Sequence, residues 1–183
     1  AWPIKAHGTG GRHYKTSPDG LAYVDQNFDT YSVEYTYADG TKFFMEGRCM
    51  EGCHQIYSSA AHGTKGMAIV SRSGDCGRPS SIFSGQNPVR VDRVWVSEVD
   101  PAERNPYQNE WNDLVDAIRD DKPYNETASG VKTSLVTSMG RMAAHTGQEI
   151  TYEQILNSDH EMAPGLDKLT ENSQAPLVAD ANG

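Results

Sequence analysis

The apolar positions of this chain are spaced first as in strands and later as in helices. Between positions 30 and 37 every second residue is a tyrosine or a valine, which predicts a strand with one apolar face. Shorter strands are predicted at 4–8, 57–62, 67–71 and 89–94, separated by turns rich in glycine, serine and proline. Residues 71–84 carry no such period and are expected to form a loop. From position 105 the apolar spacing changes to three and four, which is typical of amphipathic helices.

The length of the loop after the strand at 30–37 can be inferred, because each length pairs different residues of this strand and the next one. A two-residue turn would place Tyr35 opposite Phe44 and would mix apolar with polar side chains on each face. A three-residue loop at 38–40, with Gly40 in the left-handed conformation, instead pairs Tyr35 with Phe43 and Val33 with Met45. This register brings the apolar side chains together, so we expect it.

The first predicted helix begins at Pro106, with Asn105 as its cap and Gln108 as the partner of a capping box. Its apolar stripe consists of Trp111, Leu114, Val115 and Ile118. We expect this stripe, and Trp111 above all, to be buried.

Two more helices follow. One is capped by Asn125 and stops at Gly147, and the other begins at Thr151 with Gln154 completing a capping box. The inward face of the longer helix is expected to carry Val131, Leu135, Met139 and Met142.

Strands followed by helices predict an α+β fold, in which a mostly antiparallel, open sheet has helices packed on one face. We expect one domain over residues 1–162 and an extended tail over 163–183. One face of the sheet lacks a predicted cover, and aromatic residues there would suit a subunit interface.

Charge and composition exclude some classes of partner. The 183 residues carry a net charge of −9 with scattered basic residues, which argues against nucleic-acid binding. No apolar run approaches the length of a membrane span. Three cysteines are too few, and odd in number, for a disulfide framework.

Several motifs in order resemble one known family. They are GTGGR (8–12), the hairpin VEYTYADGTK, the turn HGTKG (62–66), and the series NPYQ, DAIR, KPYNE and GRMAAHTGQ. Together they resemble the C-terminal half of the Gfo/Idh/MocA oxidoreductases, the group of glucose–fructose oxidoreductase and inositol dehydrogenase. The nearest subgroup is bacterial and commonly exported.

The resemblance implies a two-domain enzyme. An N-terminal Rossmann domain would bind NAD or NADP, and a C-terminal domain would shape the substrate pocket and the oligomer. Hydride would pass between the nicotinamide and a hydroxyl of a sugar or polyol, with a lysine and a histidine as acid and base.

The chain lacks the sequence motifs that the family uses for cofactor binding and catalysis. It contains no G-x-G-x-x-G between a strand and a helix, and the lysine motif of the family is absent. The family histidine would precede Ala1. We therefore expect a domain taken from a longer protein, with no Rossmann domain, no catalytic residue and no cofactor site of its own, and inactive by itself. Its missing partner would be the Rossmann domain of the same polypeptide.

Two groups of residues are candidates for substrate binding. Arg12 and His13 lie in the glycine-dense loop expected after the first strand. The resemblance implies that this loop lies over the substrate cleft, where an arginine can donate several hydrogen bonds to sugar hydroxyls. Cys53, His54 and Gln55 fall where the family places side chains against the substrate. Both segments also suit ordinary polar surface loops, and the sequence leaves these alternatives open.

The remaining polar residues suggest structural roles. Cys49 and Cys53 lack the spacing of a zinc site, so we expect no metal. Lys65 is expected to favour the turn of the HGTKG motif. His145, near a helix C-terminus, is favourably placed against the helix dipole.

Three functions stay open at this point. The first is the substrate and oligomerisation domain of a sugar or polyol oxidoreductase. The second is the same domain of a glycosidase that uses NAD, and the third is a non-enzymatic carbohydrate-binding or scaffold module. The resemblance suggests the periplasm, with the cytoplasm as the alternative.

Overall fold

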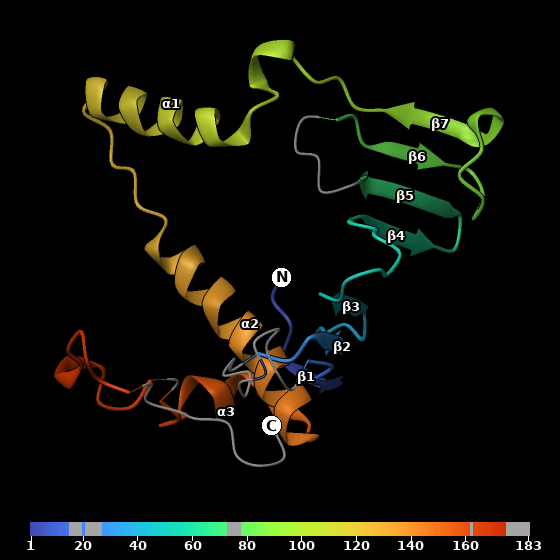
Figure 1. The fold of residues 1–183 in the computed structure, drawn as a ribbon. Helices are drawn as coiled ribbons and strands as arrows, with labels where there is room; N and C mark the ends of the chain where they lie inside the picture. Colours follow the sequence, from blue (N-terminus) through green and yellow to red (C-terminus); the bar gives the residue numbers. More distant parts are fainter. Residues whose placement is uncertain (15–19, 21–26, 73–77, 162, 175–183) are drawn as a thin grey trace. The chain divides into compact units, whose positions relative to one another are not determined.

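A computed structural model describes residues 1–14, 20, 27–72, 78–161 and 163–174 of the chain (Figure 1). The chain divides into two compact units, residues 1–52 with 126–183, and residues 53–125. The first unit contains β1 (Lys5–Gly11), β2 (Thr30–Thr36), β3 (Lys42–Arg48), α2 (Thr127–Thr146), β8 (Ile150–Thr151), α3 (Tyr152–Leu156) and the 3-10 turn η3 (Leu166–Lys168). The second contains β4 (Ser59–Gly63), β5 (Gly66–Ser71), β6 (Ser81–Phe83), η1 (Arg90–Asp92), β7 (Arg93–Val96), η2 (Pro101–Glu103) and α1 (Pro106–Arg119).

The first unit is built on an antiparallel sheet with the strand order β3-β2-β1-β8. The pairing of β2 with β3 sets Tyr35 opposite Phe43 and Val33 opposite Met45. Gly40 has φ 85°, in the left-handed region. The turn is closed by two backbone hydrogen bonds, from Tyr37 N–H to the Thr41 carbonyl oxygen and from Gly40 N–H to the Tyr37 carbonyl oxygen. The predicted register and its three-residue loop are confirmed.

Helix α2 packs on the face of this sheet that carries the alternating tyrosines and valine. The core consists of Ala6, Val33, Tyr35, Met139, Ala143, Ala144, Ile150 and Ile155. Met139 is fully buried, and Leu135 and Met142 pack partly buried against the core as predicted. Val131, one turn before Leu135, is exposed, so its predicted burial is wrong in this unit.

The glycine-dense stretch belongs to β1, which runs to Gly11 instead of ending at residue 8. A Cβ on Gly10 would lie 2.6 Å from Cδ2 of Phe28, and one on Gly8 would lie 2.8 Å from the Ser32 carbonyl oxygen. These glycines therefore let a ring and a neighbouring backbone approach the strand closely. The expected glycine loop is wrong, because this stretch pairs with β2 along its whole length.

The second unit holds an antiparallel sheet with the order β4-β5-β6-β7. Strands β4 and β5 lie close to their predicted positions, and Lys65 lies in the turn between them as expected. Residues 89–94 were predicted as a strand, but Asp92 N–H donates to Val89 O and closes a 3-10 turn before β7. Strand β6 lies in the segment expected to be a loop, of which residues 73–77 are outside the described part.

Helix α1 begins as predicted, since the Asn105 side chain accepts hydrogen bonds from the N–H groups of Tyr107 and Gln108. The reciprocal bond from the Asn105 N–H to the Gln108 side chain, which would complete the predicted capping box, is not formed, and Nε2 of Gln108 donates to Asn112. None of its residues is buried, and Trp111 is 63% exposed, so the predicted burial of this stripe is wrong in the described unit. In its own unit, α1 contacts η2, the short turn that precedes it.

The other helix ends agree with the sequence except in one position. Gly147 ends α2 with φ 68°, and Thr151 and Gln154 form both bonds of the predicted capping box. Helix α2 begins at Thr127 with Glu126 in the cap position, so the prediction of Asn125 as the cap is wrong.

The fold class is α+β, with antiparallel, open strands and the long helix on one sheet face, as predicted. The strands form two four-stranded sheets where the sequence suggested one. The assignment of residues 1–162 to one domain stays a prediction. In the tail, residues 166–168 form a 3-10 turn, and residues 175–183 lie outside the described part.

Candidate functional site

The candidate residues Arg12 and His13 lie in the first unit, directly after β1. Arg12 is half-buried and His13 is exposed. The backbone N–H groups of His13 and Tyr14 both donate to Oδ2 of Asp29, at 2.5 and 2.8 Å. The structure thus brings the predicted pair together with a carboxylate that the sequence pattern had not singled out.

Asp29 is held in its charged form by these contacts. The N–H of Tyr14 has the largest effect on the pKa of Asp29 and lowers it, against a smaller opposing effect of burial. The N–H of His13 and the Arg12 guanidinium lower this pKa further. The segment that carries Arg12 and His13 is therefore bound to the charged carboxylate of Asp29.

An aromatic cluster lies next to this segment, where β2 meets the end of α2. Phe28 and His145 stack with ring centroids 3.8 Å apart and planes within 2°. The Tyr31 hydroxyl lies 2.8 Å from Nε2 of His145 and accepts a hydrogen bond from the N–H of Phe28. Its own proton is then available to His145, which accepts it when neutral.

His145 is disfavoured as a cation. Burial lowers its pKa most, and the positive charges of Arg141, Arg12 and His160 lower it further. The expected benefit from the helix dipole is smaller than these effects, because the shift has the opposite sign. His145 thus acts as a neutral, stacked partner of Tyr31 and Phe28, and no sequence signal pointed to this contact.

The second candidate group, Cys53, His54 and Gln55, lies in the other unit, before β4. Cys53 is half-buried, and the two residues after it are exposed. Arg12 and His13 belong to the first unit, so a site that combines the two groups stays a prediction.

Within the described residues, no group of three or more histidine, cysteine or acidic side chains could hold a metal ion. In the same part of the chain, no helix is long and apolar enough to cross a membrane. Cys76 lies outside the described residues, while Cys49 and Cys53 are free thiols.

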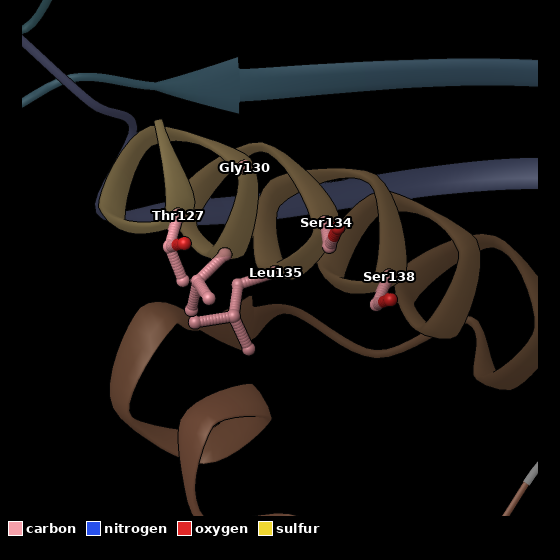
Figure 2. Close-up of a pocket in the computed structure, with 6 residues that line it drawn as sticks. Thr127, Gly130, Ser134, Leu135 and Ser138 are labelled. Atoms are coloured by element: carbon pink, nitrogen blue, oxygen red, sulfur yellow. The ribbon is translucent and has the colours of Figure 1, made fainter. Parts of the chain in front are cut away.

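A shallow groove follows α2 and is lined by Thr127, Gly130, Val131, Ser134, Leu135 and Ser138 (Figure 2). Every lining residue comes from this one helix, and the set contains hydroxyl and apolar groups but no titratable side chain. The groove therefore offers no acid, base or nucleophile, and it is better described as an open helix face than as an active site.

No protein-family model matches the chain, and no curated protein sequence matches it. The chain is similar to several solved structures, among them two oxidoreductases. The aldose–aldose oxidoreductase of Caulobacter crescentus, complexed with glycerol, superposes with a TM-score of 0.57 at 15% identity, over 82% of this chain and 41% of that chain. An NAD-binding oxidoreductase of Klebsiella pneumoniae gives a TM-score of 0.58 at 13% identity, over 82% of this chain and 46% of that one.

These similarities establish the fold. The chain has the α+β fold of a part of these oxidoreductases, as the resemblance of its motifs led us to expect. It spans less than half the length of each.

Proposed function

We propose that this chain is the substrate-binding and oligomerisation part of an NAD(P)-dependent oxidoreductase of the Gfo/Idh/MocA type, acting on a sugar or polyol hydroxyl. The observation that carries the proposal is the shared fold with two oxidoreductases, one an aldose–aldose oxidoreductase, over 82% of this chain. A Rossmann domain of the same polypeptide would hold NAD or NADP and supply the acid and base. The cofactor would accept or donate the hydride there.

In this proposal, Arg12 and His13 are hydrogen-bonding groups for the polyhydroxylated substrate. The guanidinium is a fork of donors, and the imidazole can donate or accept, so the pair suits vicinal hydroxyls. Cys53, His54 and Gln55 would add further polar contacts.

The test uses the complete polypeptide that contains this sequence. NAD(P)H fluorescence would report cofactor binding, and a panel of aldoses and polyols would be screened for a change in nicotinamide absorbance. We expect cofactor binding and turnover of at least one sugar. Arg12→Ala should raise the KM for this sugar about tenfold or more, because each lost charged hydrogen bond costs 1.5–3 kcal/mol by order of magnitude.

Arg119→Ala is the matched control, because Arg119 lies on exposed α1 and pairs with the exposed Asp116 one turn before it. It should leave the KM for the sugar unchanged. Cleavage of a glycoside without net change of nicotinamide would indicate the glycosidase instead. Sugar binding without nicotinamide binding would indicate a carbohydrate-binding module, and either result would overturn the oxidoreductase.

The oligomer is proposed to form through an open face of the second sheet. Ala61, Ala68, Ile82 and Trp95 lie opposite one another across its four strands, which places them in one row on the same face. Ile82 and Trp95 are 42% and 49% exposed in the chain. A continuous apolar row of this kind suits a second copy of the same sheet.

The first sheet is a poorer candidate. On its face away from α2, Glu34 accepts a bond from Lys42 at 2.6 Å and lies 3.4 Å from His7. Covering this face would remove charged groups from water, which costs free energy unless each finds a partner. We therefore favour the second sheet.

Sedimentation of the complete protein tests the interface. Trp95→Glu should dissociate the oligomer, whereas Val91→Glu should not, although Val91 is 89% exposed in the same unit. The proposal fails if the wild-type protein is monomeric, or if Trp95→Glu leaves the oligomer intact.

A further inference from the structure

Asp29 lies at one end of the first sheet, where three strand termini meet. Its backbone N–H donates to the Gly11 carbonyl oxygen at 3.0 Å, and its carbonyl oxygen accepts from Cys49 N–H at 2.8 Å. It therefore continues the ladder from the end of β1 to the end of β3, one residue before β2 begins. This backbone position does not depend on the side chain, so the carboxylate remains available for another role.

The carboxylate fixes the segment that leaves β1. One oxygen, Oδ2, accepts from two consecutive N–H groups, those of His13 and Tyr14. Two successive amides directed at one atom restrict the backbone angles between them, and with these the direction of both neighbouring side chains. Arg12 precedes these amides directly, and its positive charge acts on the same carboxylate.

A second tether acts on the same segment. The Tyr14 hydroxyl accepts from Glu51 N–H at 2.7 Å, and the rings of His13 and Tyr14 meet edge to face at 4.8 Å. The chain after β1 is thus tied to Asp29 at its backbone and to the turn after β3 at the Tyr14 side chain. Neither tether uses the Arg12 or His13 side chain as its hydrogen-bonding group.

We infer that Asp29 is the positioning residue that holds Arg12 and His13 in the arrangement with which they bind a sugar hydroxyl. The inference rests on the proposed function, and it adds a residue to which the sequence motifs assign no role. Asp29 acts through backbone amides and touches neither substrate nor cofactor.

The experiment compares Asp29→Ala, Asp29→Asn and Asp39→Asn in the complete protein. Asp39 is a matched control, because its Oδ1 accepts the N–H of Thr41 at 2.9 Å in the loop at the opposite end of the same strands. Each of the two aspartates also has its pKa lowered mainly by a backbone N–H. The control thus reports the general effect of losing such a carboxylate.

Asp29→Ala should raise the KM for the sugar about tenfold or more, since small misplacements of positioning groups cost activity on this scale. Asp29→Asn should give a smaller rise, because an amide oxygen can still accept both N–H bonds without the charge. The KM for the nicotinamide cofactor should stay unchanged in both. Asp39→Asn should change neither KM.

Amide hydrogen exchange of His13 and Tyr14 is measured in the same variants and does not require activity. Faster exchange at these amides in Asp29→Ala, with a raised sugar KM, supports the inference. Unchanged exchange, or faster exchange with an unchanged sugar KM, overturns it. If the wild-type protein neither binds nor turns over any sugar, the proposed function is wrong. The role of Asp29 in positioning groups for a sugar is then wrong as well, even if amide exchange shows that Asp29 holds His13 and Tyr14.

Discussion

The hydroxyl of Tyr35 occupies the place where a side chain at residue 140 would begin. A Cβ built on Gly140 would lie 1.9 Å from Oη of Tyr35, far inside van der Waals contact. Tyr35 is 4% exposed, and its burial raises the pKa of its hydroxyl. Helix α2 therefore lies close on the sheet because residue 140 has no side chain.

Gly140→Ala should lower the free energy of unfolding by on the order of 2 kcal/mol, although alanine is the better helix former. The buried tyrosine cannot move without displacing its neighbours in the core. Gly130→Ala on the same helix is the control, because a Cβ there meets nothing within 4 Å. It should raise the stability by about 0.5–1 kcal/mol. Urea unfolding followed by circular dichroism measures both, and equal effects of the two changes would contradict the packing argument.

Gly10→Ala should disturb the ring of Phe28 and, through it, the stack on His145. Its Cβ would lie 2.6 Å from Cδ2 of Phe28 and 2.8 Å from the carbonyl oxygen of Thr30, and the second atom cannot move aside. We expect a loss of about 1–3 kcal/mol in stability. Gly11→Ala is the neighbouring control, since its Cβ meets only Oγ1 of Thr30 at an ordinary 3.8 Å. Thermal unfolding and the ring proton shifts of Phe28 are the measurements, and unchanged shifts in Gly10→Ala would count against the contact.

The turn between β2 and β3 depends on backbone conformation alone. Gly40 has φ 85°, and a Cβ there would meet nothing within 4 Å. Gly40→Ala should therefore cost about 1–2 kcal/mol through strain without any clash. Asparagine enters the left-handed region more easily, so Gly40→Asn should cost clearly less. Chemical unfolding of the two variants tests this order, and equal losses would point to a cause other than φ.

Local patterns in the sequence predict this hairpin, whereas contacts between residues far apart in the chain could not be predicted from it. The register of β2 and β3 follows from matching apolar faces across a three-residue loop, so Tyr35 and Phe43 could be paired from spacing alone. Strands β6 and β8 span only three and two residues and exist through partners distant in the chain, which leaves no period to detect.

In the candidate site, too, the sequence predicts some of the residues but not the distant contacts that hold them. Arg12 and His13 were found because their residue types suit a polyol, but their anchor, Asp29, is about 16 positions away and lies in no recognisable motif. The stack of His145 on Phe28 joins residues still farther apart in the sequence. In helix α1 the sequence predicts a burial that the described unit does not show. An amphipathic stripe indicates that one helix face is packed against something, but not which part of a longer protein packs there.

His145 should make the stability depend on pH near neutrality. Its pKa in the folded chain lies below the ordinary histidine value of about 6.5, mainly through burial. As the pH falls below that value, the unfolded chain binds a proton before the folded chain does, so the free energy of unfolding decreases until the folded-state pKa is passed. The stability is therefore fully present above about pH 7 and is partly lost towards pH 5.

His145→Gln removes this titration and keeps a side chain that can bond to the Tyr31 hydroxyl. The variant is expected to be less stable than the wild-type chain at pH 7.5 or so, because it lacks the stack on Phe28, and to lose less stability on going to about pH 5.5. Asp29, Glu34 and Asp39 have lowered pKa values and lose their contributions only at still more acidic pH, so they do not obscure this window. Urea unfolding at several pH values, with an NMR titration of the His145 ring, gives the measurement. A wild-type chain and variant with parallel pH profiles would show that His145 is not held in its neutral form.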